Sequence, residues 1–133
     1  AIGMFSGIWF LVCLGFPAVR WITDRDPFSY WSDGFDEFMS GFLGIFYAQP
    51  AWYANPFIII AVALLILDKT LHWALCLAAM LLAPLAMFEY GRTHCLGACT
   101  TTVGFGPGYY LWVALTVFLT AVSAIDQEMK ARG

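Results

Sequence analysis

Two cysteines and a histidine, His94, Cys95 and Cys99, are the residues whose type and spacing most readily suggest chemistry. Thiolates and an imidazole this close together could hold copper or zinc, with a fourth ligand from Glu89 or another outer loop. The same thiols could instead form a short disulfide ring in an oxidising compartment, or remain free. No second CxxC or HxxxH element accompanies them. The sequence therefore leaves a disulfide, free thiols and a metal site open.

The other histidine, His72, lies at the start of an apolar stretch, four residues after Asp68 and beside Trp73. A histidine within a membrane can ligate haem or a chlorin, or relay protons. An imidazole at the wet end of a membrane helix costs little, so we expect a solvated side chain. His94 is expected at the opposite membrane face, so the two histidines cannot ligate one haem. No cofactor is expected, while haem, a chlorin or a metal stays open.

The composition of the chain is dominated by hydrophobic residues. Of 133 residues, 62% are hydrophobic and 11% charged, and the mean hydropathy is +0.77. A soluble domain carries about a quarter charged residues. The composition therefore argues against a disordered segment, a nucleic-acid binder and a soluble enzyme. It predicts an integral membrane protein with at most about five spans of roughly 20 residues.

The charge-free stretches predict an all-α integral membrane protein with four transmembrane helices and a short re-entrant or interfacial helix, in one membrane domain, 1–133. Pro50 and Pro56 break the long stretch 38–67. A fifth span through 33–49 is the alternative. The expected elements are spans at 2–20, 51–67, 70–88 and 108–125, a short helix at 37–48, and outer loops at 21–36 and 89–107.

Loop charges and interfacial aromatics indicate an orientation. Lys130 and Arg132 in the tail favour cytoplasmic termini, and the protein is expected to be multi-pass in a bacterial inner membrane. Aromatic residues gather at the opposite ends of the spans, where such side chains anchor a protein at the headgroups. The expected anchors are Trp21, Trp52, Tyr53, Tyr109, Tyr110 and Trp112.

Small residues recur at the spacing that lets membrane helices approach closely. Their main expected role is packing within the bundle, and Gly3 with Gly7 could also face a partner. The rows are Gly3 and Gly7; Ser40, Gly44 and Ala48; and Ala74 and Ala78.

Apart from Arg20 at the end of the first span, the predicted spans contain no charged residue. A transporter or proton pump normally carries polar groups near the bilayer midplane, so transport is disfavoured. The outer loops hold no Ser-His-Asp set in plausible register. No catalytic residue is therefore assigned, and no enzyme activity is expected.

Two aromatic elements resemble small uncharacterised bacterial inner-membrane proteins. Residues 52–56 read W-Y-A-N-P, and residues 106–112 follow the pattern G-x-G-Y-Y-L-W. The resemblance covers about half of the chain. It implies a bacterial four-span protein and no particular activity.

The leading functional hypothesis is a non-catalytic accessory or structural subunit of a larger inner-membrane complex, acting through helix packing and an aromatic outer surface. Its expected partners are other membrane subunits and lipids, and no nucleic acid. The alternative is a membrane redox or metal-binding protein that uses the loop with His94, Cys95 and Cys99. A small carrier or channel is the third hypothesis.

Overall fold

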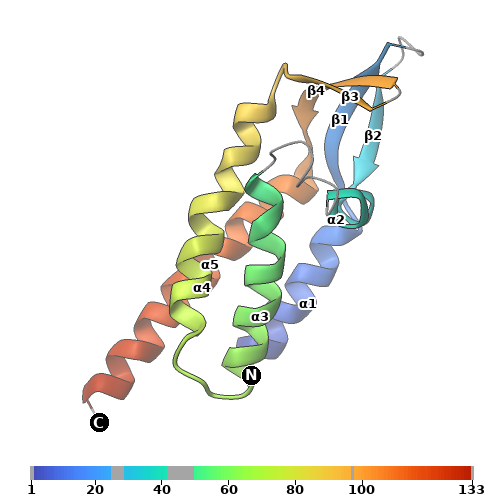
Figure 1. The fold of residues 1–133 in the computed structure, drawn as a ribbon. Coiled ribbons are helices and arrows are strands. Elements are labelled where there is room, and N and C mark those ends of the chain that lie inside the picture. The colour runs from blue at the N-terminus through green and yellow to red at the C-terminus, as the bar shows by residue number, and fades with distance from the viewer. Residues whose placement is uncertain (1, 25–28, 42–49, 97, 133) are drawn as a thin grey trace.

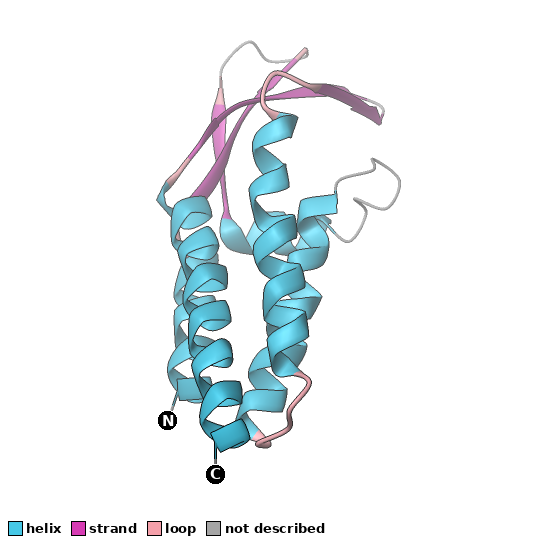
Figure 2. Ribbon diagram, turned by 90° about the vertical axis from the view of Figure 1, so that its left-hand side faces the viewer, coloured by secondary structure: helices cyan, strands magenta, loops and turns pink. Residues whose placement is uncertain are grey.

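A bundle of helices carries a small β-sheet at one end in the computed structural model, which describes residues 2–24, 29–41, 50–96 and 98–132 (Figure 1). The long helices are α1 (Ile2–Leu14), α3 (Ala54–Ile66), α4 (His72–Leu82) and α5 (Pro107–Arg132). The two termini lie together at the end of the bundle away from the sheet (Figure 2). The sheet therefore lies at the opposite end of the bundle from both termini.

Prolines and apolar runs set the helix boundaries. The 3₁₀ helix η2 (Pro50–Tyr53) leads into α3, and the 3₁₀ helix η3 (Ala83–Glu89) continues α4. Pro84 stands in the first turn of η3 and supplies no backbone N–H. Helix α1 ends at Leu14, because Gly15 and Phe16 form a turn and Pro17 begins a strand.

Two helices in the described part of the chain are long and apolar enough to cross a membrane: His72–Glu89 and Pro107–Arg132. They coincide with the predicted spans at 70–88 and 108–125. The other apolar helices, Ile2–Leu14 and Ala51–Ile66, are shorter. The first ends before the predicted limit of residue 20, since residues 17–23 form a strand.

The prediction of an all-α fold is wrong at the end of the bundle where the outer loops were expected, here called the outer end. The strands β1 (Pro17–Thr23), β2 (Tyr30–Asp33), β3 (Thr93–Leu96) and β4 (Ala98–Phe105) form an antiparallel sheet in the order β2-β1-β4-β3. Most of the two expected outer loops, 21–36 and 89–107, thus pairs into one sheet. β-Branched and aromatic residues, abundant in both segments, favour extended backbone.

The short helix also differs from its prediction. Helix α2 (Gly34–Gly41) begins three residues earlier than expected, and the Asp33 carboxylate caps it by accepting a hydrogen bond from the Asp36 backbone N–H at 2.9 Å. Residues 42–49 lie outside the described residues, and they include Gly44 and Ala48 of the packing row predicted with Ser40. Within α2, the Ser40 hydroxyl donates to the Asp36 carbonyl.

Small side chains let the helices pack closely. A Cβ atom on Gly3 would lie 2.7 Å from Cγ1 of Ile66, so the glycine packs α1 against α3 inside the bundle rather than facing a partner. On α4, Ala74 and Ala78 are half-buried. The fully buried row of α4 and η3 lies on a neighbouring face and consists of His72, Cys76, Ala79 and Ala83.

Candidate functional site

A partly enclosed cavity of about 120 Å³ lies where the sheet meets the outer end of the bundle. The end of α1, strands β1 and β4, helix α2, the start of α3, η3 and the start of α5 all contribute to its wall. Segments distant in the sequence therefore meet here. Its aromatic lining consists of Trp21, Phe38, Trp52, Phe105, Tyr109 and Trp112.

Three glycines hold the sheet against the bundle at this cavity. Gly34 approaches the Cys13 carbonyl at the end of α1, and Gly106 approaches the Pro17 carbonyl at the start of β1. A Cβ atom on Gly108 would lie 2.6 Å from the Phe16 carbonyl oxygen. Backbone hydrogen bonds use this close approach: the Gly106 N–H donates to the Ala18 carbonyl at 2.8 Å. Larger residues would push the sheet away from the helices and open the cavity.

Two polar atoms in the cavity wall are buried and have no hydrogen-bond partner among the described residues. One is Oγ1 of Thr102 on β4, a residue that is 2% exposed, and the other is the indole Nε1 of Trp112 on α5. Asn55, at the start of α3, is a further buried polar residue in the wall. Buried polar groups in native proteins are nearly always paired, so an unpaired donor and hydroxyl in one cavity need an explanation.

Two carboxylic acids also line the cavity. Glu37 on α2 accepts hydrogen bonds at Oε1 from the Trp21 indole N–H, at 2.9 Å, and from the Ser32 hydroxyl. Burial nevertheless raises the pKa of Glu37 above its ordinary value of 4.5, because burial penalises the ionised form more than these two donors favour it. Glu89, at the end of η3, is buried, and its Oε1 lies 3.6 Å from Nη1 of Arg92.

Trp21 and Glu37 separate the cavity from a shallow groove on the outside of the molecule. Both residues line the cavity and the groove. On the outer side they adjoin Tyr30, Met39 and Thr100. The hydrogen bond between Trp21 and Glu37 therefore forms part of the wall between the cavity and the outside.

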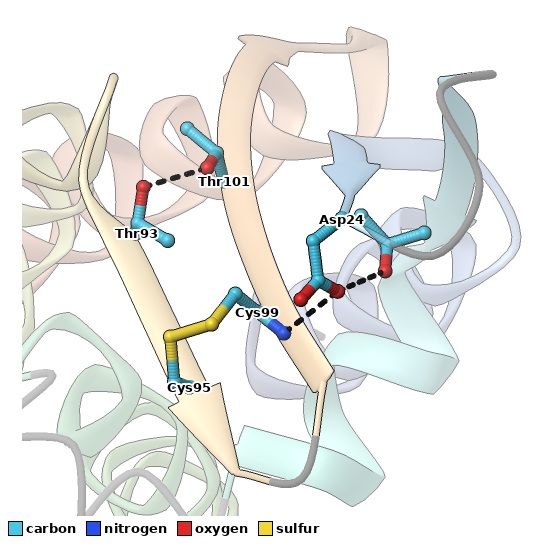
Figure 3. Close-up of a disulfide and its surroundings, with 6 residues drawn as sticks. Asp24, Thr93, Cys95, Cys99 and Thr101 are labelled. Carbon is cyan, nitrogen blue, oxygen red and sulfur yellow. Dashed lines mark hydrogen bonds between the residues drawn. A yellow bond between two sulfur atoms is a disulfide. The ribbon is translucent and has the colours of Figure 1, made fainter.

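The two cysteines of the outer loop form a disulfide, which is one of the three states that the sequence left open. Cys95 and Cys99 face each other across the hairpin of β3 and β4, with Cα atoms 4.0 Å apart (Figure 3). Asp24 ties this hairpin to β1: its carboxylate accepts from the Cys99 N–H at 3.0 Å, and its own N–H donates to the Cys99 carbonyl. Thr93 and Thr101 add a cross-strand hydroxyl pair at 2.8 Å.

The disulfide bears directly on the predicted metal site. Its sulfurs are bonded to each other, so they do not supply the thiolates that a site with His94 would need. The side chain of His94 lies outside the described residues. Among the residues that are described, no three His, Cys, Asp or Glu side chains are grouped to hold a metal ion.

His72 is fully buried between α4 and α5, and the expectation of a solvated imidazole is wrong. Its Nδ1 lies 3.0 Å from the Ser123 hydroxyl and its Nε2 lies 3.1 Å from the Asp126 carboxylate. The Cys76 thiol contacts the same hydroxyl at 3.3 Å. Ser123 and Asp126 were not among the predicted site residues, although both lie on one face of the last helix at a spacing of three residues.

A serine, a histidine and an aspartate in contact have the connectivity of a hydrolase triad. Here Ser123 is fully buried in the bundle, and neither cavity described above includes it. The contacts instead join α4 to α5. Lys130 extends the connection by pairing with Asp126 at 2.9 Å and with Asp68 in the turn between α3 and α4.

The predicted interfacial anchors divide into two groups. Trp21, Trp52, Tyr109 and Trp112 line the cavity and are half-buried or buried. Tyr110 is exposed on the outside of α5, as an anchor at the headgroups would be, while Tyr53 is half-buried. Most of these aromatic residues therefore serve the interior of the protein.

No family model matches the chain, and neither a curated protein nor a solved structure is similar to it. The two aromatic elements at 52–56 and 106–112 still have a common structural role. The first opens α3 and places Trp52 and Asn55 in the cavity wall, and the second opens α5 and places Tyr109 and Trp112 there. Both elements thus converge on one site.

Proposed function

We propose that the chain is a non-catalytic accessory subunit of a larger bacterial inner-membrane complex, with four membrane-crossing segments and the sheet outside. The observation that carries the membrane part is the outward face of α1, where apolar side chains are exposed. Met4, Phe5, Ile8 and Leu11 are each more than half exposed. Water-soluble monomers seldom expose apolar patches of this extent, whereas a bilayer or a partner helix covers them.

The four crossings would be α1, α3, α4 with η3, and α5. The last two are long enough to cross unaided. Helix α1 has 13 residues and would measure about 20 Å, against a hydrocarbon core of about 30 Å. Local thinning of the bilayer accommodates a short span at modest cost.

Two features support an orientation with the sheet in the periplasm. The turn between α3 and α4, which holds Lys69, lies at the end of the bundle that carries the termini (Figure 1), and the last turn of α5 there holds Lys130 and Arg132. Basic residues favour the cytoplasmic side. The disulfide between Cys95 and Cys99 lies in the sheet, and disulfides persist in the periplasm rather than in the cytosol.

An aromatic cluster on α1 and α5 is the surface best suited to a partner. The rings of Phe5, Trp9 and Phe118 pack with centroids 5.5–5.8 Å apart. Aromatic side chains ordered by their neighbours lose little entropy on binding and are enriched in interfaces. We therefore infer that this cluster docks against a helix of another membrane subunit.

Extraction of native membranes with a mild detergent tests the proposal. The protein should comigrate with large partners, which mass spectrometry would identify. The variant Phe5→Ala should release it from the complex. Leu81→Ala is the matched control, because Leu81 is similarly exposed but lies on α4, away from the cluster. A monodisperse monomer in every mild detergent would contradict the accessory role.

A further inference from the structure

The unpaired atoms of the cavity wall indicate which hydrogen-bonding group a bound molecule would carry. The Trp112 indole N–H can only donate a hydrogen bond, so its partner must be an acceptor. The Thr102 hydroxyl can also donate a hydrogen bond. Both atoms are buried in the wall and have no partner among the described residues. An oxygen acceptor on a bound molecule would satisfy both groups.

The remainder of the wall favours an apolar body. Leu14, Phe105 and Tyr109 are among the side chains that line it. A water molecule occupies about 30 Å³ of liquid and needs two to four polar partners. The cavity of about 120 Å³ has room for about four waters, and its largely apolar wall offers them few hydrogen-bond partners. An amphiphilic molecule matches this wall better than water alone.

Charge in the cavity narrows the class of ligand further. Glu37 and Glu89 both line the wall, and their carboxyl groups disfavour an anion. A cation would leave the Trp112 N–H without an acceptor. Burial raises the pKa of Glu37, which agrees with an environment that disfavours ionised groups. The ligand that fits is therefore uncharged.

We propose that this cavity binds the carbonyl-bearing end of a small uncharged amphiphile, whose oxygen accepts hydrogen bonds from Trp112 Nε1 and Thr102 Oγ1. The volume suits one compact ring or short acyl group, since an engineered cavity of about 150 Å³ holds benzene. A ring ketone such as a quinone head and the ester group of a lipid share this chemistry. The aromatic elements at 52–56 and 106–112 build the walls of this binding site.

Titration of the full chain in dodecyl maltoside, a detergent without a carbonyl, tests the proposal. Tryptophan labelled with ¹⁵N reports each indole N–H by NMR, and Trp112→Phe identifies the resonance of Trp112. Three probes with equal numbers of heavy atoms are added: cyclohexanone, methyl butyrate and methylenecyclohexane. Cyclohexanone or methyl butyrate should shift the Trp112 indole resonance downfield in a saturable manner. The tighter of the two distinguishes a ring ketone from an ester.

Methylenecyclohexane is the decisive control, because it keeps the shape of cyclohexanone but replaces the oxygen with carbon. It should cause no saturable downfield shift. Thr102→Val should weaken binding of the carbonyl probe about 3- to 10-fold through the loss of one hydrogen bond. Ser6→Ala is the matched variant, since Ser6 Oγ is also buried and unpaired but does not line the cavity. It should leave the affinity unchanged.

Two results would overturn the proposal. One is an equal response to methylenecyclohexane and cyclohexanone, which would mean that the cavity does not recognise a carbonyl. The other is the absence of any saturable shift with both carbonyl probes in wild-type protein, as expected for a cavity that holds water only. Neither result would affect the accessory role, because comigration with partners is measured independently.

Discussion

Both ends of the bundle bury polar side chains, but they differ in whether these side chains are paired. The end that carries the termini is called the inner end here, and the end that carries the sheet is the outer end. At the inner end, His72, Ser123 and Asp126 satisfy one another by hydrogen bonds of 3.0–3.1 Å. At the outer end, Thr102 and Trp112 leave polar atoms unpaired in a cavity. The residues of the inner group therefore need no further hydrogen-bond partner to account for their burial. The outer group has no hydrogen-bond partner among the described residues.

Hydrogen bonding distinguishes the two ends of the bundle more clearly than residue type does. A histidine is a more usual candidate for chemistry than a threonine, yet the buried His72 has both ring nitrogens engaged. Satisfied buried networks stabilise and specify packing, whereas unsatisfied groups retain free energy that a ligand can recover. The hydrogen-bonding state of a residue is therefore a better guide here than its chemistry.

The largest expected effect comes from breaking the inner network. His72→Ala removes the side chain that joins α4 to α5, leaves the Ser123 hydroxyl with only the Cys76 thiol, and opens a void. We expect a loss of about 3 kcal/mol in the free energy of unfolding. Unfolding of the purified protein by denaturant in detergent measures it. Leu71→Ala, at an exposed neighbour, should cost about 0.5 kcal/mol or less.

A loss of less than about 1 kcal/mol for His72→Ala would remove the contrast between the two ends. It would mean that the inner contacts add nothing beyond ordinary packing. The network would then have to be considered again as a functional group.

The second effect is smaller and has the opposite sign at the two ends. Thr102→Val removes an unpaired hydroxyl with little change of shape, so the protein without ligand should gain about 1 kcal/mol of stability. Ser123→Ala, at the inner end, removes a partner of His72 and should cost about 1–2 kcal/mol. The same unfolding measurement serves for both variants. A destabilised Thr102→Val would show that water or another group already satisfies the hydroxyl.

The parts of the fold that could be predicted depend on residues that lie close together in the sequence. The spans at 70–88 and 108–125 were predicted because long charge-free runs favour helices that can cross a membrane. The disulfide was among the predicted alternatives because Cys95 and Cys99 are four residues apart. In each case the deciding signal lies within one segment.

Contacts between distant residues explain what the sequence could not predict. The sheet pairs residues 17–23 with residues 98–105, and residues 98–105 were expected to lie in an outer loop. Ser123 and Asp126 meet His72 from more than fifty positions away. The aromatic residues of the elements at 52–56 and 106–112 were interpreted as interfacial anchors, because nothing within either segment indicates that both face one cavity.

The smallest expected effect concerns the wall between the cavity and the outer groove, and it depends on pH. The raised pKa of Glu37 means that the folded protein holds this proton more tightly than the unfolded chain does. Stability should therefore be greatest near or below pH 4.5, the ordinary value, and fall as the pH rises toward the raised pKa. The effect is small because Trp21 and Ser32 partly offset the cost of burial.

Glu37→Gln isolates this contribution, since glutamine keeps an oxygen that can accept from Trp21 and Ser32 but does not titrate. Thermal unfolding from acid to neutral pH should show equal stability at acid pH and a growing advantage for the variant as the pH rises. Asp36→Asn removes an exposed charge whose repulsion adds a smaller part of the rise in the pKa of Glu37, so this variant should retain most of the pH dependence of the wild type. If wild-type stability instead increased over this range, Glu37 would be stabilised as an anion. The outer end would then resemble the inner end, with its charges satisfied by the fold itself.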